Sequence, residues 1–293
     1  MKIKVSLGEK VFDIVNNLIM ILVAFIMIYP LYYVLIASIS DAAQLVAHKG
    51  ILLAPLSPTK LAYELAFKNP MLLRGYVNTI FIVVVGVAVN LILSVIGAYF
   101  LSRKGVRLQK PIMILIIITM FFSGGMIPFY FSVRDLGLEN SLWALIFSSA
   151  INTFNLIIMK TAFLGVPEAL TESAYLDGAG HIRILWSIIL PVTTSTIAVV
   201  GLYYAVGHWN AWFNAMLFLK DREKFPLQLI LREILIQNNM TEMADGNDVA
   251  GRAFISETIK YAVIVIATAP ILCVYPFLQK YFTRGVMVGA VKG

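Results

Sequence analysis

The chain has 293 residues, of which 60% are hydrophobic and only 13% are charged, and its mean hydropathy is +0.85. Soluble domains are typically about 45–50% apolar and about 25% charged, so this composition excludes an ordinary soluble domain and indicates a membrane protein. The net charge of +7 does not indicate nucleic-acid binding, because the basic residues cluster beside apolar runs without any RNA- or DNA-reading motif. Cys273 is the only cysteine, which excludes an intrachain disulfide and a cysteine-based metal site.

Six segments are apolar and long enough to cross a hydrocarbon core about 30 Å thick. Each must be helical, because a lone strand would leave its backbone polar groups unpaired in lipid. The predicted fold is therefore an all-α membrane protein with six transmembrane helices, forming one domain over residues 1–293. The segments are 12–39, 76–102, 111–131, 142–164, 186–206 and 256–280.

The first segment follows a basic N-terminus, as in a secretory signal peptide. Its apolar run, residues 18–37, is too long for a signal h-region of about 7–15 residues, and no A-x-A-like cleavage site follows. We therefore expect it to be a retained first span.

The loops between the segments set the expected orientation. Loop 40–75 contains three prolines and is expected to carry a short helix near 59–67, while loop 207–255 is also long and mixes both signs of charge. Short loops rich in Lys and Arg decide topology, so both termini are predicted to be cytoplasmic. The deciding basic residues are Lys2, Lys4, Lys10, Arg103, Lys104, Arg107, Lys110, Lys280, Arg284 and Lys292.

Two segments contain features at or near their outer ends. The third ends in Ser123-Gly124-Gly125-Met126-Ile127-Pro128, which should kink the helix, either for packing or to shape an outer mouth. The fifth runs into an aromatic and amide-rich stretch, 207–219. We interpret its His208, Trp209 and Trp212 as interface anchors rather than ligands.

A short polar insert lies between the fourth and fifth segments. Residues 168–177 favour a short helix, which Gly178 and Gly180 should end. Pro191 should kink the span that follows.

The spacing of this insert, E-x-A-x-x-x-G-x(9)-I-x-L-P from Glu172 to Pro191, resembles the cytoplasmic EAA loop of ABC importer permeases. Asp177-Gly178-Ala179 matches the sugar-transporter variant, whereas Ser173 replaces the usual alanine. The tail 281–293 and residues 208–219 resemble the second membrane subunit of carbohydrate importers. Residues 121–130 resemble the branch for aldouronate, alginate and related oligosaccharides.

This resemblance implies a type I ABC importer permease in a bacterial inner membrane, surrounded by lipid. The implied partners are a homologous second permease, a cytosolic ABC ATPase dimer and an extracytoplasmic solute-binding protein. The chain has no Walker A motif, so it is expected not to be an enzyme and to hold no cofactor or metal; ATP and Mg would bind the partner ATPase. The EAA loop, about 165–185, would couple to that ATPase, with the tail 281–293 also cytoplasmic. The implied coupling residues are Glu172, Ala174, Asp177, Gly178, Ala179, Gly180 and Pro191.

Polar side chains inside the spans are candidates for the sugar pathway, because such residues usually face the bundle interior. Helix–helix hydrogen bonding, worth about 0.6 kcal/mol on average, is the alternative for each. Asn152 and Asn155 are three residues apart and so should share one helical face. Arg74 and Arg134 lie near the expected outer ends, where they would suit an anionic substrate or simply snorkel. The pathway candidates are Asn78, Asn90, Asn152, Asn155, Tyr203 and Tyr204.

Three other classes were weighed. A permease for amino acids, peptides or phosphate would lack the tail and the Asp-Gly-Ala variant. A channel or ion-coupled carrier should show buried acidic residues or matched broken helices. An intramembrane enzyme should show a motif such as H-E-x-x-H or G-x-S-x-G, or paired carboxylates inside the membrane.

Overall fold

The computed structural model describes residues 7–237, 258–274 and 276, and within them every regular element is a helix. The chain divides into two compact units, one formed by residues 1–69 with 233–269 and the other by 70–232 with 270–293. Each is described by itself. The expectation of one permease domain over the whole chain stays a prediction.

The first unit contains one long apolar helix and two short ones. These are α1 (Leu7–Ser38), α2 (Ala42–Ala47) and α3 (Leu61–Lys68). Most of α1 has its apolar side chains exposed, as a helix surrounded by lipid requires, and only its last turn is buried. There it packs against Leu45 and Leu52.

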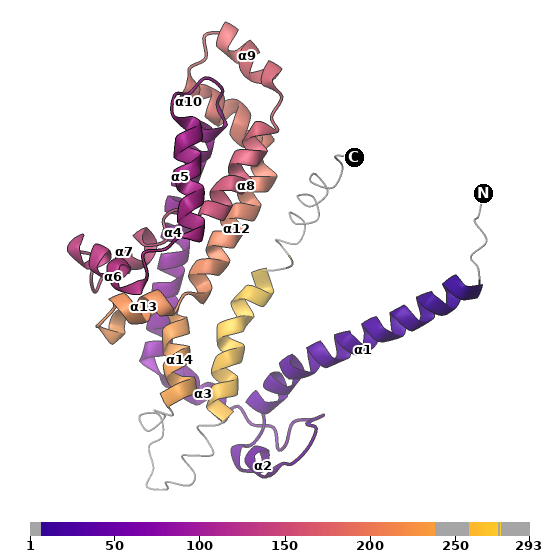
Figure 1. The fold of residues 1–293 in the computed structure, drawn as a ribbon. Helices are drawn as coiled ribbons and strands as arrows, with labels where there is room; N and C mark the ends of the chain where they lie inside the picture. The colour runs from indigo at the N-terminus through magenta and orange to yellow at the C-terminus, as the bar shows by residue number, and fades with distance from the viewer. Residues whose placement is uncertain (1–6, 238–257, 275, 277–293) are drawn as a thin grey trace. The chain divides into compact units, whose positions relative to one another are not determined.

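The second unit is built around α4 (Pro70–Ser102), which packs along α8 (Thr153–Leu164) and α12 (Thr194–Asn210) (Figure 1). Close packing is possible because the buried face of α4 carries small residues. The shared core is apolar and includes Ala98, Leu101, Leu156, Met159, Phe163 and Val200.

Shorter helices complete this unit and lead out of it. Figure 1 shows α9 at one end of the α4–α8–α12 bundle and α13 toward the other. Among these helices are a π-helix, η1, and a 3-10 helix, η2. The elements are α5 (Gln109–Phe121), α6 (Met126–Asp135), α7 (Leu142–Phe147), α9 (Glu168–Leu176), α10 (His181–Ile184), η1 (Leu185–Ile189), α11 (Leu190–Val192), α13 (Phe213–Phe218), η2 (Arg222–Lys224) and α14 (Leu227–Gln237).

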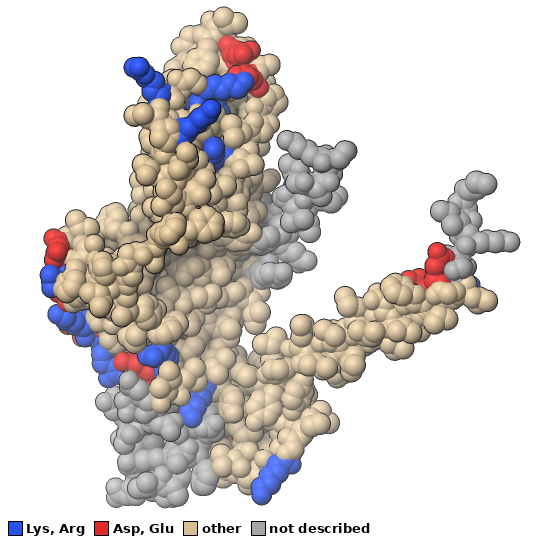
Figure 2. Space-filling view, viewed as in Figure 1, with Lys and Arg blue, Asp and Glu red and all other residues tan. Residues whose placement is uncertain are grey.

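Charged side chains of the second unit gather in two places on the face shown in Figure 2. One group lies at the α9 end and the other beside α6 and α13, with an uncharged band between them. An uncharged band between two charged ends is the surface expected of a protein that crosses a bilayer.

Of the six predicted spans, two are found as single long helices among the described residues. Segments 12–39 and 76–102 correspond to α1 and α4, which are both long and apolar enough to cross a membrane. The predicted kink near the end of the third segment, 111–131, is confirmed, since α5 and α6 are bent by 118° relative to one another. The predicted helix near 59–67 is found as α3, whereas α2 was not predicted.

The predicted kink at Pro191 is also confirmed. The helix is bent by 84° between Val192 and Thr194. Proline offers no N–H to the preceding turn, and the wider π-helical turn of η1 lies just before it.

The prediction of a continuous helix over 142–164 is wrong. The helix α7 ends at Phe147 and α8 begins at Thr153, leaving residues 148–152 as a break. Asn152 has extended backbone angles and caps α8, because its Oδ1 accepts a hydrogen bond of 3.1 Å from the Asn155 N–H. Asn152 and Asn155 therefore do not share a helical face.

The sixth segment is described only in part, as an apolar helix over Thr258–Val274. The rest of 256–280, and the tail 281–293, lie outside the described residues.

Candidate functional site

The polar insert folds as α9, which is tied to the loop after α4 by an ion pair. Lys104 Nζ lies 2.5 Å from Glu168 Oε2 in the first turn of α9. The hydrogen bond to Glu168 raises the pKa of Lys104. Both side chains are exposed, so the pair fixes geometry more than it adds stability.

The end of α9 is a glycine-based Schellman cap. Gly178 has φ +77°, its N–H donates to the Tyr175 carbonyl (3.0 Å), and the Ala179 N–H donates to the Ala174 carbonyl (2.9 Å). Ala174 and Ala179 also belong to one apolar cluster, as this motif favours. The predicted break at Gly178 is therefore confirmed.

The two faces of α9 differ. Thr171 and Ala174 are buried, and Ala174 packs in the core that contains Phe163. Glu172 is exposed, and Leu176 is 89% exposed. The small residue of the motif thus packs within its own chain, while the glutamate side is available to a partner.

The other predicted coupling residues are distributed unevenly. Asp177 and Gly180 are exposed beside the cap, and Ala179 is half-buried. Pro191 lies apart from them, in α11, where it contributes to the bend rather than to the exposed loop.

A polar cluster joins the end of α9 to α4. His181 Nδ1 lies 2.9 Å from the Tyr175 hydroxyl oxygen and 3.2 Å from the Tyr99 hydroxyl oxygen. The Arg103 guanidinium lies over the Tyr99 ring, 4.9 Å from its centroid. Side chains in direct contact therefore link the end of α9 to the end of α4.

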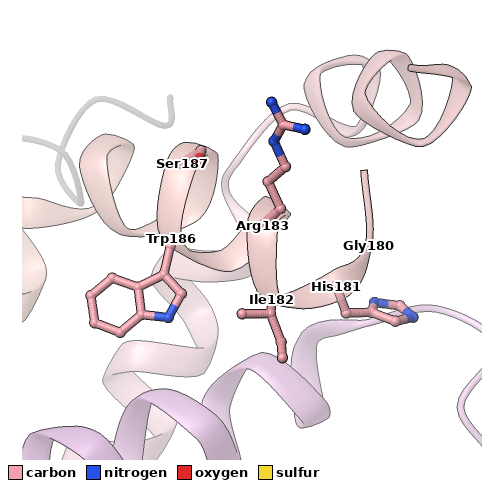
Figure 3. A pocket seen from close by; sticks show the side chains of 6 residues that line it. All are labelled: Gly180, His181, Ile182, Arg183, Trp186 and Ser187. Carbon is pink, nitrogen blue, oxygen red and sulfur yellow. The ribbon is translucent and has the colours of Figure 1, made fainter. Parts of the chain in front are cut away.

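Beside this cluster is a wide, open hollow of about 730 Å³. Figure 3 shows that its lining side chains do not converge, since Arg183 points away from Ile182 and Trp186. Ile182 and Trp186 are 77% and 68% exposed, so this end of the unit presents a mixed apolar and basic surface. The lining residues are Gly180, His181, Ile182, Arg183, Trp186 and Ser187.

A smaller cavity of about 260 Å³ lies between α8, α12 and the 148–152 break. Among the residues that the structure describes, its polar lining consists of amides, phenols, a hydroxyl and an imidazole, without a carboxylate, lysine or arginine. Four of the six predicted pathway residues line it. The lining is Leu145, Ser149, Asn152, Asn155, Tyr203, Tyr204, Gly207, His208, Ala211 and Asn214.

The other two pathway candidates make bonds inside the protein. Asn78 Nδ2 donates to the carbonyls of Glu223 (2.8 Å) and Phe225 (3.1 Å), holding η2 against α4. Asn90 is fully buried and bonds to His208. The interpretation of His208 as an interface anchor is wrong, because this side chain is buried against α4.

The two arginines that were expected near the outer ends are each paired with a carboxylate. Arg74 lies 3.4 Å from Glu223, and Arg134 lies 2.9 Å from Asp135 and over the Phe131 ring. In both pairs a neighbouring carboxylate partly offsets the positive charge of the arginine.

Asn140 holds two loops together at the end of the unit opposite α9, and the sequence analysis did not single it out. It has φ +56°, its Oδ1 accepts from the N–H groups of Lys220 and Asp221, and its carbonyl accepts from Lys224 Nζ (2.8 Å). Asparagine tolerates this left-handed conformation better than most residues. Its place just after Gly137, between two apolar runs, is a turn signal that would have pointed to it.

Ionised side chains surround Asn140 and the two loops that it joins. The hydroxyl of Tyr130 donates to Glu139, and together with Lys220 it lowers the pKa of that carboxyl. Hydrogen bonds from Lys224 and Asn140 likewise lower the pKa of Asp221.

Comparison with known proteins places the chain among transport permeases. It is 43% identical to protein LplC of Bacillus subtilis, over 97% of this chain and 96% of the relative. It is 40% identical to the polygalacturonan/rhamnogalacturonan transport system permease protein YtcP of the same organism, over 97% and 99% of the two chains. No protein-family model matches the chain.

A solved structure agrees over nearly the whole length. A chain in the crystal structure of a bacterial ABC transporter involved in the import of the acidic polysaccharide alginate is 34% identical and superposes with a TM-score of 0.86. The match covers 94% of this chain and 98% of the other.

The fold and the relatives together define a membrane permease subunit. The chain belongs to the family of sugar ABC transporter permeases. The predicted carbohydrate-importer family is confirmed, and its relatives are transport subunits rather than enzymes.

Proposed function

We propose that this chain forms half of the translocation pathway of an ATP-driven importer for uronate-containing oligosaccharides in a bacterial inner membrane. The observation that carries the proposal is the polar cavity between α8 and α12, in a chain that is similar to a polygalacturonan/rhamnogalacturonan permease and to a chain of an alginate importer. Hydroxyl-rich sugars are bound by amide and hydroxyl groups with aromatic rings nearby, which is what this cavity supplies. Its neutral lining does not oppose an anionic sugar.

Six spans with both termini in the cytoplasm remain our proposed topology. Two helices are long enough alone, two bent pairs together have the required length and apolarity, and α8 and Thr258–Val274 are shorter apolar helices. In this arrangement α9 is cytoplasmic, and Asn140 faces the outside.

The coupling partner is a separate ABC ATPase dimer. The exposed carboxylate of Glu172 would meet a donor in a groove on the ATPase, and the buried Ala174 would anchor α9 to its own permease. A homologous second permease and an extracytoplasmic solute-binding protein complete the complex. ATP and Mg would bind in the ATPase.

The proposal is tested by ATPase measurements on the reconstituted complex of this chain, its second permease and the ATPase. The solute-binding protein is added with a panel of neutral and uronate oligosaccharides. We expect the uronate oligosaccharides to stimulate hydrolysis. Stimulation by neutral sugars alone would contradict the substrate class, and the absence of stimulation by any glycan in an assembled complex would contradict the sugar path.

Replacing the exposed carboxylate separates coupling from assembly. We expect the Glu172→Lys variant to insert and assemble normally but to lose substrate-stimulated ATPase activity. The reversed charge would prevent α9 from binding the groove on the ATPase and moving with it. Ser173→Ala restores the family's residue at an exposed site and serves as the matched control with normal stimulation. Normal stimulation in Glu172→Lys would show that this residue is not part of the lever.

A further inference from the structure

Two buried polar side chains, Asn90 in α4 and His208 near the end of α12, form a pair inside the second unit. Asn90 is completely buried, and His208 is 7% exposed. Polar groups at membrane depth are costly and usually have a function. His208 lines the polar cavity, but Asn90 does not, so a direct contact with sugar does not account for Asn90.

The hydrogen bonds of Asn90 define how His208 is protonated. Asn90 Nδ2 donates to the carbonyls of Ser149 and Ala150, both at 2.8 Å. Its Oδ1 therefore faces His208 Nε2, which lies 2.6 Å away. An amide oxygen only accepts, so His208 Nε2 must carry the hydrogen.

The histidine ring lies in a socket on α4 that only glycine permits. A Cβ added at Gly86, one turn before Asn90, would lie 2.6 Å from His208 Nε2 and 2.9 Å from Cε1. The ring is therefore located by two successive turns of α4, through contact at one and a hydrogen bond at the other.

The carbonyls that Asn90 satisfies belong to the 148–152 break. Unpaired backbone groups at membrane depth cost several kcal/mol, so the break needs these partners. A second clamp lies one turn along both helices, where the Tyr204 hydroxyl oxygen lies 2.7 Å from Ser94 Oγ and accepts the Asn152 N–H at 3.0 Å. Two pairs, each joining α4 to α12, thus hold the break that separates α7 from α8.

We infer that Asn90 is a positioning residue that acts through its partner His208 and sets the shape of the sugar cavity by holding the 148–152 break open toward it. The inference rests on the proposed sugar path. Ser149, Asn152 and Tyr204 line the cavity only while the break keeps this geometry. The pair therefore controls how tightly the cavity binds sugar, although Asn90 does not touch the sugar.

The test measures oligosaccharide transport by the reconstituted complex against substrate concentration. We expect Asn90→Leu and His208→Leu to raise KM about tenfold, because each leaves buried polar groups unpaired and deforms the cavity. The maximal rate per assembled complex should change much less. A purely structural role would reduce the amount of active complex and leave KM unchanged, and that result would overturn the inference.

Two conservative variants test the donor atom even if the leucine variants fail to assemble. His208→Gln can supply an N–H near the position of Nε2 and should keep KM close to that of the native protein. The asparagine of His208→Asn is too short to reach Asn90, so this variant should have a raised KM. Equal KM values for these two variants would contradict the inference. Thr161→Val, which removes a hydroxyl bonded only within α8, is the matched control.

A spectroscopic measurement does not depend on sugar transport. The chain has three histidines, so the ring ¹⁵N signals of His208 can be assigned by their loss in His208→Gln. We expect a protonated Nε2 whose signal shifts in Asn90→Leu. An unprotonated Nε2, or a signal that does not shift in Asn90→Leu, would overturn the pairing of His208 with Asn90. A native complex that transports no glycan would instead overturn only the proposed function.

Discussion

Gly178 shows how one residue sets the end of the coupling helix. Its φ of +77° is strained for most residues with a Cβ, yet apart from the chain neighbours no described residue has an atom within 4 Å of where that Cβ would be. A substitution there therefore meets no neighbour, and its cost is conformational alone. The cap that Gly178 forms also fixes Ala179 against the core.

We expect Gly178→Ala to destabilise the end of α9 by about 1 kcal/mol, which corresponds to about fivefold faster local opening. Hydrogen exchange of the Gly178 and Ala179 amides in the purified protein measures this opening. Gly178→Asn should have a smaller effect, because asparagine tolerates the left-handed region. Equal exchange rates in the two variants would contradict the conformational explanation.

The lowered pKa of Glu139 predicts that the end of the second unit that contains Asn140 is sensitive to acid. The hydrogen bond from Tyr130, followed by that from Lys220, lowers the pKa of Glu139. A carboxyl whose pKa is lower in the folded state stabilises the fold above its unfolded pKa, and this contribution is lost as the pH falls through the folded pKa. Asp221, whose pKa is lowered by Lys224 and Asn140, acts in the same direction.

Tyr130→Phe should therefore move the acid-induced loss of stability to a higher pH. Thermal unfolding in detergent, measured from about pH 6 to about pH 3, checks this shift. Tyr32→Phe is the control, because that hydroxyl donates to a backbone carbonyl, of Leu53 at 2.6 Å, rather than to a carboxylate. An identical pH dependence of the two variants would show that the Tyr130 bond does not matter to stability.

Among the elements, α8 depends on its cap. With 12 residues it is a short helix, and Asn152 Oδ1 accepts the Asn155 N–H at its start. Asn152→Ala should lower the unfolding free energy by about 1 kcal/mol, whereas Asn152→Ser keeps an oxygen that can cap. Thermal or denaturant unfolding of both variants tests this difference. Equal stability would mean that another group satisfies the first turn.

The same elements show what could be predicted from the sequence and what could not. The breaks at Gly125 and Pro191 follow from backbone chemistry that is local to those residues, and both were expected. The 148–152 break was missed because its carbonyls are satisfied by Asn90, about 60 residues earlier. Since a tertiary bond allows that break, hydropathy alone reads 142–164 as one helix.

The candidate site divides in the same way. The EAA spacing locates the exposed loop and its glycine cap, but only the structure shows that Ala174 faces inward and Glu172 outward. The polar residues of α8 and α12 were identified as pathway candidates by their type. Residue type did not separate the cavity-lining Asn155 from Asn78, whose amide holds η2, because that difference arises from packing.

At the scale of the whole molecule, the second unit carries charges at both ends of an uncharged band, and the coupling loop and the two loops joined by Asn140 lie at opposite ends (Figures 1 and 2). If the uncharged band lies in the membrane in the proposed orientation, a reagent outside the cell can reach a thiol at only one of the two ends. Leu136, close in sequence to Asn140, is 73% exposed, and Ser173 is exposed on α9. In a Cys273→Ser background, we expect an impermeant thiol reagent to label Leu136→Cys in intact spheroplasts and to label Ser173→Cys only after permeabilisation. Labelling of both residues in permeabilised cells is the control. The reverse pattern would invert the topology, and with it the assignment of α9 to the ATPase side.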